Sequence, residues 1–152
     1  MKYKIESIQD SRLAFIKIKK TEEHASILYE LLNMRLHSHN ISNSDLPTYK
    51  EHESFVFSNP YRAWYLIQYE KNYVGSLYLL KSNSIGIFLL PQHHNFFDYA
   101  IKFLISSYKP LPLIKSVRAP FFSINISPEN AELIEVIENF GGKLVQQTYV
   151  IK

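Results

Sequence analysis

The hydrophobic period changes abruptly between Ile85 and Ile105, and this change constrains the fold more than any other feature of the chain. The segment IGIFLL is typical of a buried strand, and the polar residues PQHHN interrupt it. Apolar residues then recur at helical spacing: Phe97, Ala100, Ile101, Leu104 and Tyr108. The sequence therefore predicts a strand, a tight turn and an amphipathic helix that runs from Asn95 to Tyr108.

The turn between this strand and helix is a candidate anion site. The first N–H groups of a helix are unpaired and point at the preceding turn, where many folds hold an anionic cofactor. A phosphate-binding turn normally contains glycines, but His93, His94 and Asn95 occupy this one. We interpret it as a cofactor site with unusual side chains or as the remnant of one.

Similar patterns assign the other elements. Two-residue alternation or short apolar runs predict strands at residues 12–20, 63–69, 73–80, 85–90, 121–126 and 143–152. Capping residues and helical spacing predict helices at residues 22–36, 48–57 and 128–140, the last with Ser127 as cap and Gly141-Gly142 as stop. A central block of three strands with helices before and after it indicates an α/β (α+β) chain with a mixed sheet covered on both faces.

Composition narrows the function classes. The 152 residues, 46% of them hydrophobic, suit a single domain spanning residues 1–152. The net charge of 17 − 14 = +3 is scattered, so no nucleic-acid partner is indicated. The absence of cysteine excludes disulfides, thiolate metal sites and a cysteine nucleophile. No apolar run approaches a membrane span, so we expect no membrane partner and a soluble, cytoplasmic protein. The abundant Tyr and Phe side chains fall in strand-like and helix-like patterns and are interpreted as core.

Three segments in this order resemble the GNAT superfamily of acyl-CoA-dependent N-acetyltransferases. They are VGSLYL, SIGIFLLPQ followed by a helix, and INISPENAELIEVIENFGGK followed by a final strand. The resemblance covers nearly the whole chain from Arg12. It implies a mixed, mostly antiparallel sheet of six to seven strands with helices on both faces. The later motif is filled by Ile126, Pro128, Glu129, Asn130 and Gly141.

The earlier motif departs from the family. Members carry Arg or Gln, two residues, Gly, one residue, and then Gly or Ala, and their backbone N–H groups wrap the cofactor's diphosphate. The corresponding residues here are Gln92, Asn95 and Phe97. Asparagine tolerates the left-handed backbone region, so we expect Asn95 to keep the turn. The helical periodicity favours packing of Phe97 under the helix.

The resemblance implies acetyl-CoA as cosubstrate. Its pantetheine arm would add to the exposed edge of the 85–90 strand, which diverges from the 121–126 strand, and Gly86 would suit a bulge that opens the gap. The implied cofactor-binding residues are Ile87, Phe88, Leu89, Gln92, His94, Asn95, Phe96, Asn125 and Asn130. A capping or turn role is an equal alternative for the two asparagines Asn125 and Asn130. The His93-His94 pair has poor ligand spacing, so no metal site is expected.

Acetyl transfer requires an amine in its free-base form and gains from a donor that protonates the leaving thiolate. The family's tyrosine donor corresponds to Ile137 here, so Tyr149 on the predicted final strand is the candidate substitute. The alternative interpretation is that Tyr149 is an ordinary half-buried strand residue without a catalytic role. Candidate bases are His39, Glu51, His52 and Glu53. The alternative for the three consecutive ionisable residues 51–53 is an ordinary solvated helix face. Three arginines could meet an anionic substrate or be ordinary surface charges: Arg35, Arg62 and Arg118.

Three functions stay open at this point. The first is acetyl-CoA-dependent N-acetylation of a small-molecule amine, with an amino sugar as one candidate. The second is a catalytically inactive GNAT-fold binding or regulatory module, which the missing glycines and Ile137 would allow. The third is an enzyme that uses a different acyl-CoA. The expected partner is the small amine, and a homodimer is left open.

Overall fold

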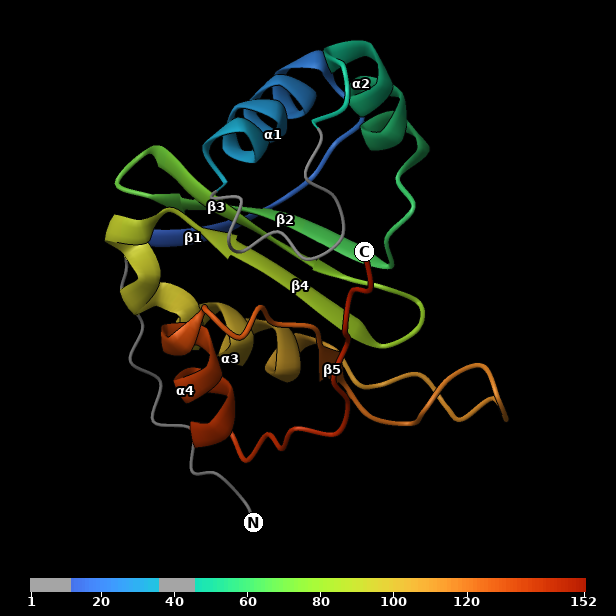
Figure 1. The fold of residues 1–152 in the computed structure, drawn as a ribbon. Coiled ribbons are helices and arrows are strands. Elements are labelled where there is room, and N and C mark those ends of the chain that lie inside the picture. Colours follow the sequence, from blue (N-terminus) through green and yellow to red (C-terminus); the bar gives the residue numbers. More distant parts are fainter. Residues whose placement is uncertain (1–11, 36–45) are drawn as a thin grey trace.

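The computed structural model describes residues 12–35 and 46–152 (Figure 1). Its strands are β1 (Leu13–Lys17), β2 (Ala63–Tyr69), β3 (Asn72–Leu79), β4 (Ser84–Leu89) and β5 (Ser123–Ile124). Its helices are α1 (Glu22–Met34), α2 (Tyr49–Ser58), α3 (Phe97–Ser107) and α4 (Ala131–Asn139), with a short 3-10 helix, η2 (Pro91–Phe96), directly before α3. The order of elements is the predicted one up to α4.

The strands form one mixed sheet in the order β1-β2-β3-β4-β5. Neighbouring strands are antiparallel except β4 and β5, which run parallel. The expected six to seven strands are therefore wrong for the described residues, which hold five. The missing one is the predicted strand at 143–152, where every residue is exposed and no ladder forms.

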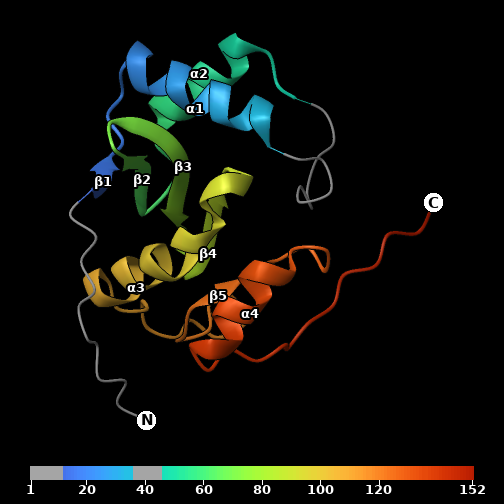
Figure 2. The same ribbon diagram turned by 90° about the vertical axis from the view of Figure 1, so that its left-hand side faces the viewer.

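Helices cover both faces of this sheet, as predicted. Figures 1 and 2 show α1 and α2 on one face and α3 and α4 on the other. Two apolar clusters follow from this arrangement. One lies under α3 and α4 and includes Leu77, Leu89, Phe97 and Leu104. The other lies under α1 and α2 and includes Leu28, Val56, Trp64 and Leu66. Alternate residues of β4 face the two clusters, so this strand separates two chemically distinct sides.

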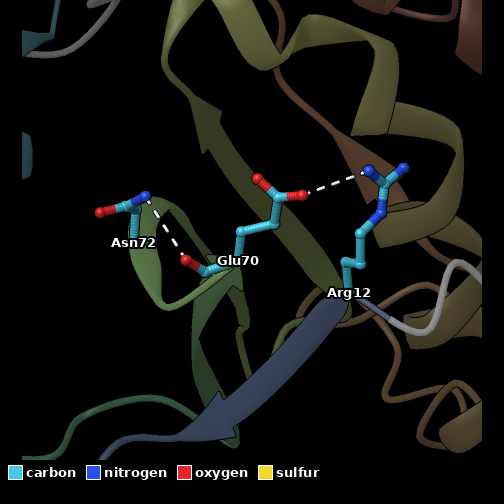
Figure 3. A network of polar contacts seen from close by, with 3 residues as sticks. All are labelled: Arg12, Glu70 and Asn72. Atoms are coloured by element: carbon cyan, nitrogen blue, oxygen red, sulfur yellow. Dashed lines mark hydrogen bonds and ion pairs between the residues drawn. The ribbon is translucent and has the colours of Figure 1, made fainter.

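The β2–β3 hairpin turns through Glu70 and Lys71, whose φ angles are 49° and 69°. Two successive positive φ angles are the signature of the tight turn that matches strand twist. Arg12 Nη1 lies 3.2 Å from Glu70 Oε1, and Asn72 Nδ2 donates to the Glu70 carbonyl at 3.5 Å (Figure 3). These contacts join the start of β1 to the hairpin turn.

Capping residues set where the helices begin. Thr21 caps α1 as predicted, and Thr48 caps α2 through a reciprocal capping box with Glu51. The start of α4 differs from the expectation, because Asn130 is the cap and its side chain accepts from the Leu133 N–H. Ser127 instead closes a turn by accepting from Asn130 N–H. The capping alternative for Asn130 is thus the observed contact.

Gly86 does not form the predicted bulge. It lies opposite Tyr78 in an unshifted β3–β4 register, and the register shift of the sheet lies between Ile67 and Gln68 instead. A Cβ at Gly86 would come within 1.9 Å of the Tyr78 ring. The glycine is therefore required by a ring that lies against the strand. Within residues 12–35 and 46–152, no helix is long and apolar enough to cross a membrane.

Candidate functional site

The parallel strands β4 and β5 pair only at their beginnings. Ser84 is opposite Ser123 and Ile85 is opposite Ile124, and the ladder ends there. Beyond these pairs the two strands diverge, so one edge of the later part of β4 pairs with no other strand of the described residues. A diverging pair of parallel strands leaves main-chain groups and a gap that a ligand can use.

Two adjoining cavities fill this gap, with volumes of about 90 and 30 Å³. Both are lined by residues from α1's end, β4, the segment after β5, and α4: Arg35, Ile87, Asn125 and Leu133. The larger cavity also reaches Tyr78 and Gly86, and the smaller one reaches His94, Ser127 and Asn130. The gap thus connects the α1–α2 side of the sheet with the α3–α4 side.

Main-chain geometry shows which groups of β4 face the gap. The Leu90 N–H donates to the Val74 carbonyl, and the Ser84 carbonyl accepts from the Leu80 N–H. Because successive residues of a strand point their main-chain groups to opposite edges, the odd-numbered residues Ile87 and Leu89 direct theirs toward β5. The edge of β4 therefore offers hydrogen-bonding groups to the gap.

The turn after β4 is a 3-10 helix rather than an open loop. The His93 N–H donates to the Leu90 carbonyl at 2.8 Å, and the Phe97 N–H donates to the His94 carbonyl. His93 carries the kink, with φ −120° and ψ 17°, and Asn95 is not among the described residues with positive φ. The expectation that Asn95 keeps a left-handed turn is wrong, because Pro91 starts a helical turn that continues into α3. Phe97 is 2% exposed and packs in the core, as the helical periodicity predicts.

His94 connects this turn to its surroundings. Its Nε2 lies 3.1 Å from the Leu89 carbonyl oxygen, and its Nδ1 lies 3.2 Å from Glu132 Oε2 on α4. The His94 ring also lies against Phe97, with centroids 4.7 Å apart. The side chain thus occupies one of the main-chain acceptors that face the gap and fastens the turn to α4.

Six of the nine predicted cofactor-binding residues line the cavities. They are Ile87, Phe88, Leu89, His94, Asn125 and Asn130. The other three lie elsewhere: Gln92 and Asn95 are exposed on η2, and Phe96 is buried against Tyr69. The structure therefore gathers the β4 positions, the two asparagines and His94 at the cavities, and leaves the turn residues Gln92, Asn95 and Phe96 outside the cavity walls.

None of the predicted catalytic residues that the structure describes lies at the gap. His52 is 7% exposed and packs between α1 and α2 against Tyr29, and its buried Nε2 has no hydrogen-bond partner among the residues that the structure describes. Burial lowers the pKa of His52, against a smaller opposing effect of a main-chain hydrogen bond at Ala25. Glu53 is half-buried on the same helix and lines neither cavity.

Tyr149 was expected on a half-buried strand, and this placement is wrong. Tyr149 is 81% exposed on the irregular C-terminal segment, and its hydroxyl donates to Gln147 Oε1. A strand needs a partner edge, which this segment lacks among the described residues. His39 lies outside the described residues, so its predicted role stays a prediction.

Arg35 and Tyr78 line the larger cavity and were not among the predicted catalytic or cofactor-binding residues. Alternation in β3 marked Tyr78 as an ordinary strand tyrosine, and nothing local marks its contact with Gly86. No group of three His, Asp or Glu residues suited to a metal ion occurs in the part of the chain that the structure describes.

The architecture matches solved acetyltransferases. RimL, a ribosomal L7/L12 alpha-N-protein acetyltransferase in complex with coenzyme A, superposes with a TM-score of 0.63 at 16% identity, covering 85% of this chain and 78% of that one. A spermidine N-acetyltransferase from Vibrio cholerae, solved as a dodecamer, superposes with a TM-score of 0.54 at 16% identity, covering 93% of this chain and 87% of that one. The chain has the GNAT fold. The sequence itself matches no protein-family model and no curated protein sequence.

The diverging strands β4 and β5 agree with what the resemblance to the GNAT superfamily implied, whereas the turn that follows β4 does not. In this chain the turn is the 3-10 helix η2, and His94 rather than a glycine backbone lies against the gap. This chain thus combines the diverging strands that the resemblance implied with a 3-10 helical turn where the resemblance implied glycines.

Proposed function

We propose that this protein is an acetyl-CoA-dependent N-acetyltransferase that acts on the amine of a small molecule. The observation that supports it most is the gap between β4 and β5, with the cavities along it. The main-chain groups of Ile87 face that gap, and an extended amide-containing chain can add there as an extra strand. The pantetheine arm of coenzyme A is such a chain.

The residues of the gap fit the pantetheine arm of coenzyme A better than they fit its diphosphate. The strand edge suits the pantetheine arm. The diphosphate lacks a glycine cradle, because part of the N–H groups around η2 already donate within the turn. The exposed side chains of Gln92 and Asn95 would supply donors at the turn surface instead.

The chemistry is a transfer of one acyl group. The nitrogen lone pair of the free amine attacks the thioester carbonyl carbon, the carbon–sulfur bond breaks, and the sulfur leaves as a thiolate. The attacking nitrogen loses one proton and the thiolate gains one, so the overall transfer balances. Tyr78 is the tyrosine among the described residues that line the cavities, and it replaces Tyr149 as the candidate donor to sulfur.

The acceptor is proposed to be a small amine, with an amino sugar as one candidate. The solved neighbours are named for acetylation of a protein's α-amine and of spermidine, which supports an amine as acceptor without selecting its class. A GNAT-fold binding module without catalysis is the second candidate. The closed η2 turn and the placement of Ile137 outside the cavities favour it.

Two measurements separate these candidates. Acetyl-CoA at a hundred times its dissociation constant should stabilise the fold by about 2.7 kcal/mol in a thermal-shift assay. Release of coenzyme A thiol can then be followed with a thiol reagent over a panel of amines, and the cysteine-free chain adds no background. Stabilisation with thiol release supports the transferase, and stabilisation without release over the whole panel supports the binding module. No stabilisation by acetyl-CoA or coenzyme A would contradict both.

We also propose that the chain forms a homodimer through its C-terminal segment, residues 143–152. The segment is exposed throughout and carries β-branched and aromatic side chains typical of strands. Figure 2 shows it leaving the molecule beyond α4, while the outer edge of β5 has no partner strand among the described residues. Each copy thus carries an unpaired strand sequence and an open edge, which a symmetric exchange would satisfy in both copies.

A further inference from the structure

Arg35 differs from the other arginines that could meet an anionic substrate. Arg62 donates through Nη1 to the Lys109 carbonyl, and Arg118 donates through Nε to the Pro112 carbonyl. The Nε of Arg35 is buried and has no hydrogen-bond partner within residues 12–35 and 46–152. A buried unpaired donor destabilises the folded protein, and more strongly when the group is charged. An arginine that leaves this donor unpaired at the wall of a cavity is poised for a ligand acceptor.

The guanidinium lies on the α1–α2 side of the gap. It follows the last residue of α1 and stands over the ring of Phe88, 5.7 Å from the centroid. Phe88 and Tyr78 pack with the α1–α2 cluster, whereas His94 is fastened to α4 on the opposite side. The gap therefore has one side with the candidate diphosphate turn and another with Arg35.

This arrangement suggests that acetyl-CoA binds on the η2 side of the gap and the acceptor amine on the α1–α2 side. If the proposed function holds, acetyl-CoA enters from the η2 side and its thioester reaches the cavities that Arg35 lines. The acceptor amine must then approach from the α1–α2 side, because an attacking atom needs a path that the cofactor does not fill. Arg35 is positioned to contact that acceptor.

We propose that Arg35 binds an anionic group of the acceptor, so that the acceptor is a primary amine that also carries a carboxylate or a phosphate. The planar guanidinium binds both kinds of oxygen anion with paired hydrogen bonds. Its charge also disfavours the ammonium form of a nearby amine and so raises the fraction of the reactive free base. The inference rests on the proposed function and adds the substrate class to it.

The test uses the full chain with coenzyme A bound and three probe amines of similar size. Glucosamine carries no anion, glucosamine 6-phosphate carries a phosphate, and glucosaminic acid carries a carboxylate. Binding is measured by calorimetry on this complex, and acetylation is measured separately by thiol release with acetyl-CoA in place of coenzyme A, for the original chain and for Arg35→Gln and Arg35→Lys. Arg62→Gln is the matched control, because it removes the same charge from an arginine that lies outside both cavities.

We expect one or both anionic amines to bind and react better than glucosamine. Arg35→Gln should reduce that preference roughly 10- to 100-fold through KM, with partial retention in Arg35→Lys, because a charge-assisted contact is lost. Arg62→Gln should keep the preference, and coenzyme A should bind all variants equally. The anionic amine whose use depends on Arg35 then shows whether the bound anion is a phosphate or a carboxylate.

Each other outcome is also decisive. Equal use of all three amines, or a preference that survives Arg35→Gln, would overturn the inference while leaving the transferase proposal intact. Binding of an anionic amine that depends on Arg35 without any acetylation would support the anion site and contradict the transferase. Absence of binding by any anionic probe in the original chain would overturn the anion site.

Discussion

His94 Nδ1 and Glu132 Oε2 lie 3.2 Å apart and join the turn after β4 to α4. Glu132 is largely exposed, so the ion pair itself should contribute no more than about 1 kcal/mol. His94 also reaches the Leu89 carbonyl from the α4 side of the gap. We therefore regard this pair as a positioning device for the turn.

Replacing His94 with Ala should reduce the free energy of unfolding more than replacing Glu132 with Gln. The alanine removes both the ion pair and the bond to Leu89, a total of about 1–2 kcal/mol, whereas the glutamine removes only the carboxylate charge. Urea unfolding of both variants and the double variant measures this directly. A larger loss from Glu132→Gln than from His94→Ala would refute the positioning role.

Gly86→Ala should destabilise the protein and weaken coenzyme A binding together. The new Cβ would meet the Tyr78 ring at 1.9 Å, and that ring stacks on Tyr61 with centroids 4.3 Å apart. Displacing the ring pair should cost about 1–3 kcal/mol and alter the larger cavity, which Tyr78 and Gly86 both line. Chemical unfolding and a coenzyme A titration report the two effects.

The double variant Gly86→Ala/Tyr78→Ala tests the cause. Removing the ring makes room for the new methyl group, so the double variant should lose no more stability than Tyr78→Ala alone. Additive losses would show that Gly86 is needed for backbone reasons unrelated to Tyr78.

His52 should make the protein less stable as the pH falls below about 6.5, the usual pKa of histidine. Burial lowers the pKa of His52 in the folded protein, so between that lowered value and 6.5 the unfolded chain binds a proton that the folded chain does not. The free energy of unfolding then falls with decreasing pH by up to about 1.4 kcal/mol per pH unit. Above pH 6.5 this contribution is complete and constant.

The variant His52→Leu should flatten this pH dependence and leave acetylation measurable at pH 7.5, because the imidazole packs between α1 and α2 and not at the gap. Unfolding curves at several pH values and the thiol-release assay provide the readouts. Loss of acetylation in a variant that folds and binds coenzyme A would instead support the prediction that His52 is the general base.

Sequence patterns predicted those elements whose signal is local. The apolar run of β4, the spacing in α3 and the Thr21 cap each depend on neighbours within a few residues, and the structure has them within two residues of the predicted bounds. The gap between β4 and β5 was predicted only from the resemblance to the GNAT superfamily. Its cavities exist because the β4–β5 ladder ends after two residue pairs. Neither the unpaired Nε of Arg35 nor the ring over Gly86 has a local signal, since both depend on tertiary contacts.

The C-terminal segment shows the limit of such patterns. Its residues have strand propensity, yet a strand forms only where another edge pairs with it. Val150 and Ile151 are 79% and 96% exposed, and Leu113 and Val117 on the loop before β5 are also exposed. Local propensity predicted a strand there, but it could not supply the partner.

Deleting residues 143–152 should therefore convert a dimer into a monomer without lowering the stability of the monomer. Every residue removed is exposed, so little intramolecular packing is lost, whereas the strand that a second copy would receive at β5 disappears. Light scattering after size-exclusion chromatography gives the mass, and urea unfolding at low protein concentration gives the stability. A full-length chain that is monomeric at high micromolar concentration, or a truncated chain that remains dimeric, contradicts strand exchange. A truncated monomer that unfolds more easily than the full-length monomer would show instead that the segment pairs within its own chain.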